Sequence, residues 1–142
     1  MANSSCVCTA LRKASRAVTR VYDDRLAETG LTTTQFAVLR HLARHGALVL
    51  SRLAELLVMD RTSLYRTLAP IERQGWIAVE AAARGRAKQA SLTATGRDRM
   101  EKATSAWEAC QAEIVGAIGP AQWQALEEQL RMLVDKSRGR LA

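Results

Sequence analysis

The sequence predicts a mainly α-helical protein with a small β wing, an α+β fold of the winged helix-turn-helix type. The first observation is a pair of short helical patterns, residues 51–57 and 61–74, separated by a tight turn. The second is a pair of strand-like segments, residues 76–80 and 89–93, on either side of a basic loop, residues 84–88. Two helices joined by a tight turn and followed by a hairpin are typical of this fold.

Long helical patterns flank this middle part. Apolar side chains recur every three or four residues from about Cys6 to Glu28, and Gly30 is the expected stop. A second helix is predicted from Thr32, with Gln35 as its capping-box partner and Gly46 at its end.

The helix-turn-helix itself follows a short apolar run at residues 48–50, which predicts a small strand. Asp60 stands where a helix N-cap belongs, so the recognition helix should run from Arg61 to about Gln74, with Gly75 beyond its end. Pro70 lies inside this helix and should bend it, because proline removes a backbone hydrogen bond.

After the wing, Thr93 or Thr95 is expected to open a long helix that continues to about Ala117. Gly119 and Pro120 interrupt it, and proline suits the first position of a new helix. The final helix carries apolar residues along one face.

A single domain of 142 residues is therefore expected, with residues 31–95 as the winged part and residues 5–30 and 96–142 as dimerisation helices. The end helices are amphipathic and too few to bury their apolar faces alone. We predict a homodimer in which they interlock. The alternative is a monomer with these helices folded back.

Basic residues exceed acidic ones, 21 to 14, and the excess is uneven. Residues 1–50 carry a net charge of +4, residues 51–88 carry +3, and residues 89–142 carry none. A positive surface attracts polyanions and is typical of DNA-binding domains. A basic protein without such a partner remains the alternative that charge alone leaves open.

No apolar run approaches the roughly 20 residues of a membrane span. The segment from Met1 to Cys6 also lacks a basic stretch leading into an apolar core, so we expect no secretory signal. A cytoplasmic protein with no membrane partner is the expectation.

Polar side chains on the first turns of the recognition helix predict binding of double-stranded DNA, because a recognition helix reads the major groove with its N-terminal residues. Asp60 is interpreted as a cap only, and Tyr65 has the alternative of packing sideways. The predicted major-groove residues are Arg61, Thr62, Ser63, Tyr65 and Arg66, and the wing adds Arg84, Arg86 and Lys88.

The order and spacing of several short segments resemble the MarR family, the multiple-antibiotic-resistance regulators. The matching segments are Leu31-Thr32-x-x-Gln35-Phe36-x-Val38-Leu39, Leu53-Ala54-x-x-Leu57, Asp60-Arg61-x-x-Leu64-x-Arg66-x-Leu68, Glu72-Arg73-x-Gly75-x-Ile77 and Leu92-Thr93-x-x-Gly96.

This resemblance implies a triangular homodimer that binds pseudo-palindromic operators and usually represses nearby genes. It also implies release from DNA by a small-molecule effector or by oxidation of a cysteine. No cofactor is implied. The family usually has Asp-x-Arg at the wing tip, whereas this sequence has Arg84 and Arg86 there. Arg86 therefore lacks the acidic partner that orients it in the family, but minor-groove contact is still expected.

Three cysteines are present, Cys6, Cys8 and Cys110. The distance from Cys8 to Gln35 resembles that of the reactive cysteine in the organic-hydroperoxide-sensing branch of the family, and Tyr22 matches a supporting tyrosine. Arg12 and Thr33 replace the branch's other tyrosines. Cys8 is thus either an oxidant sensor, with Cys6 as its resolving thiol, or an apolar residue in a dimer interface. Cys110 is interpreted as a core residue.

His41 and His45 stand four residues apart, a spacing that suits a metal, but no CxxC pair or nearby carboxylate completes a ligand set. We predict no metal site. Hydrolase motifs and phosphate-binding glycine loops are also missing from the sequence. A regulator and not an enzyme is expected. The alternatives are a thiol-based enzyme that reacts with peroxide and a nonspecific architectural DNA binder.

Overall fold

A computed structural model of the chain describes residues 5–139, which form two compact units. The first unit ends at Trp107 and the second begins at Glu108. The protein is mainly helical with a small antiparallel sheet, as the sequence predicted. The elements in chain order are α1 (Val7–Leu26), η1 (Ala27–Thr29), α2 (Thr33–His45), β1 (Leu48–Val49), α3 (Leu50–Leu57), α4 (Arg61–Arg73), β2 (Ile77–Ala81), β3 (Lys88–Leu92), α5 (Ala94–Ile118) and α6 (Pro120–Arg138).

Capping residues mark the end of the first helical segment and the start of α2. α1 gives way to the short 3₁₀ turn η1, and Gly30 closes it with a left-handed φ of +78°. Thr32 caps α2 in the predicted capping box, in which the Thr32 and Gln35 side chains each accept a backbone N–H of the other residue. Asp23 on α1 accepts the Thr33 N–H at 2.7 Å and ties the two helices together.

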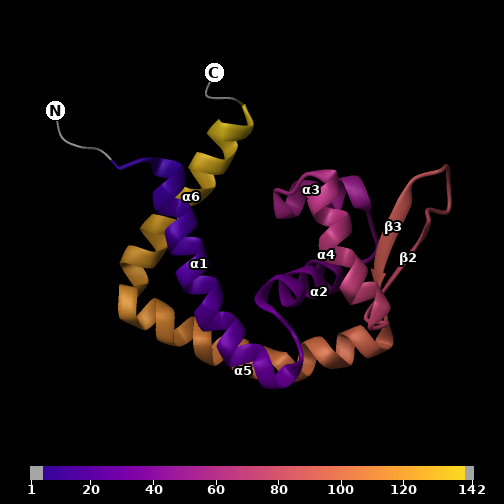
Figure 1. Cartoon of the computed structure of the whole chain (residues 1–142), viewed down its shortest axis with the longest axis horizontal. Coiled ribbons are helices and arrows are strands. Elements are labelled where there is room, and N and C mark those ends of the chain that lie inside the picture. Colours follow the sequence, from indigo (N-terminus) through magenta and orange to yellow (C-terminus); the bar gives the residue numbers. More distant parts are fainter. Residues whose placement is uncertain (1–4, 140–142) are drawn as a thin grey trace. The chain divides into compact units, whose positions relative to one another are not determined.

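The sheet has the strand order β1-β3-β2, so β3 lies in the middle. Both neighbours are antiparallel to it, with Ala90 opposite Leu48 on one side and opposite Val79 on the other. The hairpin of β2 and β3 extends beyond the helices of the first unit as the wing (Figure 1).

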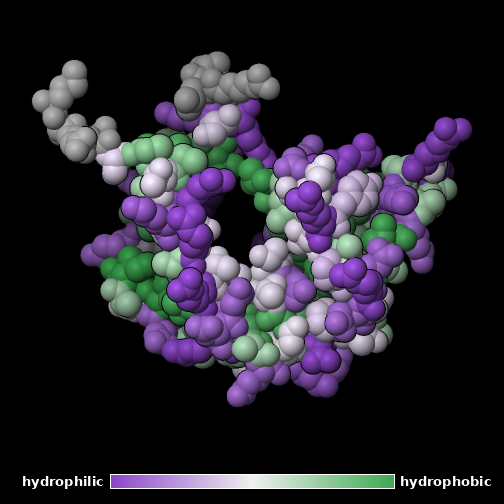
Figure 2. Space-filling view, viewed as in Figure 1, coloured by the Kyte–Doolittle hydropathy of each residue, from purple (hydrophilic) through white to green (hydrophobic). Residues whose placement is uncertain are grey.

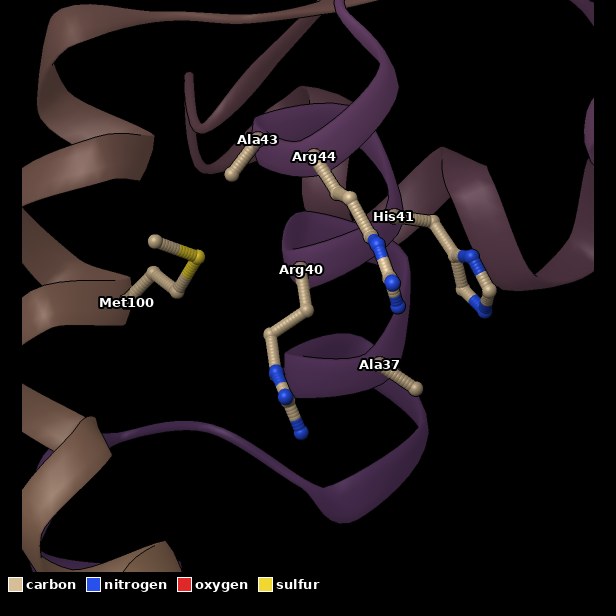
Figure 3. Close-up of a pocket in the computed structure, with 6 residues that line it drawn as sticks. All are labelled: Ala37, Arg40, His41, Ala43, Arg44 and Met100. Atoms are coloured by element: carbon tan, nitrogen blue, oxygen red, sulfur yellow. The ribbon is translucent and has the colours of Figure 1, made fainter.

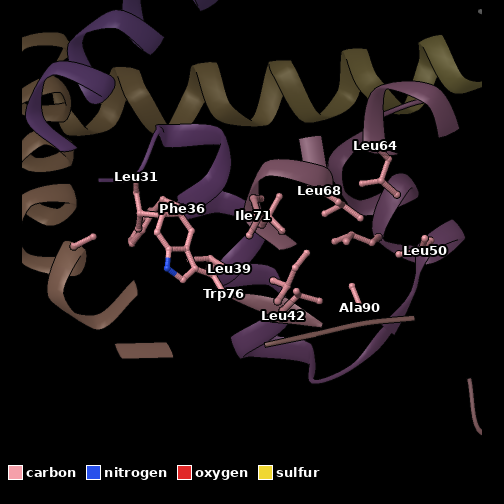
Figure 4. Packing of buried hydrophobic residues seen from close by; sticks show 14 of the residues in the cluster. Leu31, Phe36, Leu39, Leu42, Leu50, Leu64, Leu68, Ile71, Trp76 and Ala90 are labelled. Atoms are coloured by element: carbon pink, nitrogen blue, oxygen red, sulfur yellow. The ribbon is translucent and has the colours of Figure 1, made fainter. Parts of the chain in front are cut away.

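One apolar core holds the first unit together. α2, α3 and α4 bury leucines and Phe36 against each other, and Trp76, Ile77 and Ala90 close the core from the sheet (Figure 4). Among residues 5–139, no buried side chain is polar or charged. Burial of this apolar surface is the main stabilising contribution and fixes the direction in which α4 and the wing leave the core.

In the second unit, α5 ends at Ile118, and Gly119 at φ +103° leads into α6 with Pro120 in its first turn. The predicted break is confirmed. None of the helices described between residues 5 and 139 is both long and apolar enough to cross a lipid bilayer.

Some predicted boundaries differ from the structure by one residue. Leu50, expected in a strand, begins α3. The wing strands span residues 77–81 and 88–92, instead of the predicted 76–80 and 89–93. β3 ends at Leu92 because Thr93 caps α5, although the Thr93 N–H still donates to the Trp76 carbonyl. α4 continues past Pro70 to Arg73.

Candidate nucleic-acid interface

The recognition helix begins at a strong cap. Asp60 accepts the Ser63 backbone N–H at 2.8 Å and the Ser63 hydroxyl at 2.8 Å. The Ser63 N–H, and then its hydroxyl, lower the pKa of the Asp60 carboxyl, so this cap carries a negative charge at neutral pH. The role of Asp60 as a cap is confirmed. Ser63 has committed its hydroxyl hydrogen to Asp60, which leaves its oxygen lone pairs for a donor on a base edge.

The two faces of α4 differ sharply. Leu64, Leu68 and Ile71 are buried in the core. All five residues expected to contact the major groove lie on the exposed part of the helix, and Tyr65 retains 41% of its surface. Those five are Arg61, Thr62, Ser63, Tyr65 and Arg66.

The tip of the wing is exposed and basic. Arg84, Arg86 and Lys88 are all exposed, and Gly85 between the two arginines has a left-handed φ of +90°. Figure 2 shows hydrophilic side chains projecting from this tip, at the right of the view. In the described part of the chain, no carboxylate pairs with these three side chains or with Arg61 and Arg66. Five cations are thus available to a polyanion.

The recognition helix and the wing share one groove. Tyr65 and Glu72 from α4, Val79 from β2 and Lys88 from β3 line a cavity of about 170 Å³. Tyr65 therefore borders the groove between α4 and the wing and is also exposed to solvent. Leu50 and Leu68 form the floor of the same cavity.

The base of the wing is fixed to the first turn of α5. The Thr93 hydroxyl donates to the Gly75 carbonyl at 2.6 Å and accepts the Gly96 N–H at 3.0 Å. The Thr93 N–H donates to the Trp76 carbonyl at 3.1 Å. Thr93 thus caps α5 and also holds Gly75 and Trp76, the residues directly before the wing, by hydrogen bonds.

A second feature of the first unit is a basic pocket of about 530 Å³ beside α2. Arg40, His41 and Arg44 extend from α2, and Met100 reaches toward them from α5 (Figure 3). The Arg40 guanidinium stacks on the Trp107 ring, 4.1 Å from its centre. Burial lowers the pKa of His41, and the positive charges of His45, Arg40 and Arg44 lower it further. Three basic side chains around a cavity suit an anionic ligand.

The cysteines lie in two different environments. Cys6 and Cys8 are exposed at the start of α1, whereas Cys110 is buried. The Thr9 backbone N–H, followed by the Thr9 hydroxyl and the Cys8 backbone, lowers the pKa of the Cys6 thiol. Tyr22 lies half-buried fourteen residues along the same helix from Cys8. The rings of His41 and His45 stack 6.1 Å apart, and in residues 5–139 no third ligand joins them.

The residues predicted to contact DNA are exposed in the structure, whereas the sequence analysis did not identify the basic pocket. Arg40 and Arg44 stand four residues apart in the sequence, which places them on one face of a helix. Their partner Met100 is distant in sequence, so only the fold brings the pocket together.

A capped recognition helix with exposed donors, beside a basic β hairpin, defines a winged helix-turn-helix DNA-binding regulator. A protein-family model described as MarR family matches residues 29–87. The DNA-bound transcriptional regulator MosR of M. tuberculosis is 32% identical, with a TM-score of 0.87 over 95% of this chain and 98% of that one. The chain belongs to the MarR family of transcriptional regulators.

Two other solved structures are similar. A second MosR structure is 31% identical, with a TM-score of 0.83 over 97% of this chain and 99% of that one. Bordetella bronchiseptica BpsR, whose DNA binding is regulated by 6-hydroxynicotinic acid, is 24% identical, with a TM-score of 0.82 over 95% of this chain and 97% of that one. A sequence comparison with curated proteins found no match. Regulators of this family are generally not enzymes.

Proposed function

We propose that this protein binds a pseudo-palindromic operator as a homodimer and represses transcription from it. α4 enters the major groove, and the wing tip lies in the adjacent minor groove. The observation that carries the proposal is the set of five exposed cations without a carboxylate partner on α4 and the wing. Tyr65 of α4 and Lys88 of the wing line the groove between these two elements. Phosphate contacts from such cations supply affinity, and contacts to base edges supply sequence preference.

The dimer is supported by apolar surface left uncovered on one chain. Four large side chains of α1 are between 38% and 62% exposed, and Leu126 and Met132 of α6 are comparably exposed. Those of α1 are Val7, Leu11, Val18 and Val21. Exposed apolar surface of this kind marks an interface. Two recognition helices related by a two-fold axis and about 34 Å apart would read an inverted repeat.

The test compares Arg61→Ala and Arg86→Ala in competition binding at fixed salt. Arg61→Ala should weaken operator binding and relax sequence preference, by about 1–3 kcal/mol if Arg61 makes a bidentate base contact. Arg86→Ala should weaken binding most where the flanking sequence is A·T-rich, since a narrow minor groove attracts arginine.

Arg73→Ala is the matched control, because Arg73 lies exposed on the last turn of the same helix, away from its N-terminal end. It should leave sequence preference unchanged. If neither Arg61→Ala nor Arg86→Ala differs from wild type, the proposed DNA face is wrong. If bulk DNA competes as well as the operator, the protein is a nonspecific architectural binder instead.

A small anionic molecule bound in the basic pocket is the first proposed release signal. Arg40 and Arg44 offer positive charge there, His41 with its lowered pKa offers a neutral hydrogen-bond donor, and Met100 offers an apolar wall. An aromatic carboxylate has both features. Titration of the operator complex with 6-hydroxynicotinic acid should release DNA from wild type, and Arg44→Gln should raise the concentration needed. Equal sensitivity of the two proteins would contradict this site.

Oxidation at the start of α1 is the second proposed signal. A hydroperoxide would convert a thiolate to a sulfenic acid and release an alcohol, and a second thiol would then displace water to form a disulfide. The family resemblance made Cys8 the candidate sensing thiol, with packing in a dimer interface as its alternative. The Thr9 N–H and the lowered pKa support Cys6 as the attacking thiolate instead, with Cys8 resolving. A bond between subunits avoids the strain of bridging one intervening residue.

Gel shifts on single-cysteine variants, with thiol states followed by mass spectrometry, test this signal. Hydroperoxide should release wild type and Cys110→Ser from the operator, and a thiol reductant should restore binding. Cys6→Ser should resist if Cys6 attacks, and Cys8→Ser should stop at the sulfenic acid. Release of both variants at the wild-type dose would mean that the thiols only pack. Stoichiometric consumption of peroxide would distinguish a sensor from a peroxidase, which turns over with a reductant.

A further inference from the structure

Arg99 on α5 touches the end of the first helical segment and the base of the wing at the same time. Its Nη1 donates to the Thr29 carbonyl at 2.9 Å, and its guanidinium carbon lies 5.5 Å from the centre of the Trp76 ring. Thr29 is the last residue of η1, and Trp76 stands directly before β2. One side chain therefore connects α1, through η1, with the first residue of the wing.

The Thr29 end of this connection is well held. The Thr29 hydroxyl donates to the Leu26 carbonyl at 2.6 Å and accepts the Leu31 N–H at 3.3 Å. Leu26 and Leu31 are both buried in the core. The carbonyl that Arg99 binds thus moves with the end of α1, and a shift of that helix must stretch or break the bond.

The Trp76 end is held from two directions. The Trp76 carbonyl accepts the Thr93 N–H. It also packs so closely against Gly96 that a Cβ added to Gly96 would overlap the carbonyl oxygen. The Trp76 ring is 6% exposed and faces the guanidinium of Arg99. Ile77, the next residue, pairs with Leu92 as the first pair of the wing ladder. The orientation of Trp76 therefore sets the direction in which the wing leaves the core.

Arg99 differs from an ordinary surface arginine because it does not pair with a neighbouring carboxylate. Asp98 pairs with Lys102 at 2.8 Å. Within residues 5–139, no carboxylate pairs with Arg99, whose contacts are a helix-end carbonyl and an aromatic face. Both are favourable for a cation, because the carbonyl end of a helix is partly negative and an aromatic face attracts positive charge.

We propose that Arg99 is a positioning residue that couples the end of α1 to the wing. While Thr29 holds the guanidinium, Trp76 and the wing keep the orientation that DNA binding needs. Movement of α1, by either release signal, breaks the bond to Thr29 and frees the wing. This inference rests on the proposed contact between the wing and DNA, and it deepens that proposal by naming the route of regulation.

Hydrogen–deuterium exchange of the DNA-free protein tests the coupling without relying on the DNA contact. Arg99→Ala should speed exchange of the amides at residues 77–92 and 27–31. Arg99→Lys, which keeps the charge and one donor, should show a smaller change. Arg97→Ala is the matched control, since Arg97 is exposed two residues earlier on α5 and its side chain forms no hydrogen bond or ion pair with any described residue. Unchanged exchange at residues 77–92 in Arg99→Ala would overturn the proposal.

A double-mutant cycle with the wing tip then asks whether Arg99 acts through the wing. Arg99→Ala should weaken operator binding by about 2- to 30-fold in the wild-type background, the range expected for coupling residues. In the Arg86→Ala background its effect should nearly vanish. An equal factor in both backgrounds would overturn the proposal, because a general loss of stability acts independently of the wing. If Arg86→Ala alone has no effect, the wing contact fails, and the exchange experiment still decides the role of Arg99.

Discussion

Val58 sits in a backbone conformation that costs energy. Among the described residues it is the only one other than glycine with a positive φ, at +54°, and it is 56% exposed. It ends α3 by donating its N–H to the Glu55 carbonyl, and the chain then turns toward Asp60 and the recognition helix. A β-branched side chain is disfavoured in the left-handed region. The strain thus stands at the turn of the helix-turn-helix.

Replacing Val58 with glycine should stabilise the protein. Relief of the left-handed strain gains about 1–2 kcal/mol, and the greater freedom of glycine in the unfolded chain cancels about 0.5–1 kcal/mol of it. The net gain in the free energy of unfolding should be about 1 kcal/mol, measured by urea denaturation. Val58→Ala keeps the Cβ and should gain less. A glycine variant less stable than the alanine variant would show that the valine side chain contributes packing that outweighs the strain.

The stability of the protein should depend on the protonation of His41. Its pKa in the folded protein is lowered, chiefly by burial and then by His45, Arg40 and Arg44. Between the ordinary histidine pKa and the lowered one, the unfolded chain binds more protons than the folded protein. The free energy of unfolding should therefore fall as the pH drops from above 6.5 into that window.

Urea denaturation at pH 7.5 and pH 5.5 measures this dependence. His41→Gln should reduce the loss of stability at the lower pH, and Arg44→Gln should reduce it partly, because one neighbouring positive charge is removed. If His41→Gln loses as much stability at pH 5.5 as wild type, the pH dependence comes from other groups.

At the scale of single elements, the helix ends could be predicted from local capping residues. The strand ends and pairings could not, because they depend on contacts between residues distant in sequence. Thr32, Asp60 and Gly46 fixed helix ends from the sequence because each acts on backbone groups within four residues. The ends of the wing strands were off by one residue, and the bond between Thr93 and Trp76 was not predictable because it joins residues distant in sequence. The pairing of β1 with β3 also depends on such contacts.

The packing of α5 against the wing can be tested at Gly96. A Cβ added there would overlap the Trp76 carbonyl oxygen and lie 2.8 Å from its carbonyl carbon. Since backbone atoms cannot rotate away, Gly96→Ala should lower the free energy of unfolding by about 1–3 kcal/mol.

Gly116→Ala in the same helix is the matched control. A Cβ there meets nothing within 4 Å in the chain, so the better helix propensity of alanine should raise stability by about 1 kcal/mol. Thermal unfolding of both variants measures the difference. A Gly96→Ala protein as stable as wild type would mean that the first turn of α5 moves freely relative to Trp76.

At the scale of the whole molecule, the sequence predicted which side of α4 would be exposed, because helix periodicity separates Arg61 and Arg66 from the buried Leu64 and Leu68. The contact between Arg99 and Thr29 could not be predicted from the sequence, because the two residues are seventy positions apart. The sequence also predicted that the end helices would leave apolar faces uncovered, and the exposed valines and leucine of α1 agree with that expectation.

The last prediction concerns those uncovered faces and the assembly they imply. If α1 and α6 bury them against a second chain, a chain that ends at Gly119 should be monomeric or aggregated and should lose tight binding, because two linked half-sites are needed for high affinity. A point variant avoids the risk of gross unfolding. Leu126→Glu with Met132→Glu places charges on exposed positions of α6 and should dissociate the dimer.

Gln129→Glu is the control, because it places one of the same negative charges on an exposed polar residue of the same helix without removing an apolar side chain. Analytical ultracentrifugation gives the mass of each protein, and competition binding gives its affinity for a full operator and for a single half-site. The double variant should bind both DNAs with similar, weak affinity, whereas the control should keep the preference of wild type for the full operator. A well-behaved monomer that retains full affinity would contradict the dimer and, with it, reading of an inverted repeat.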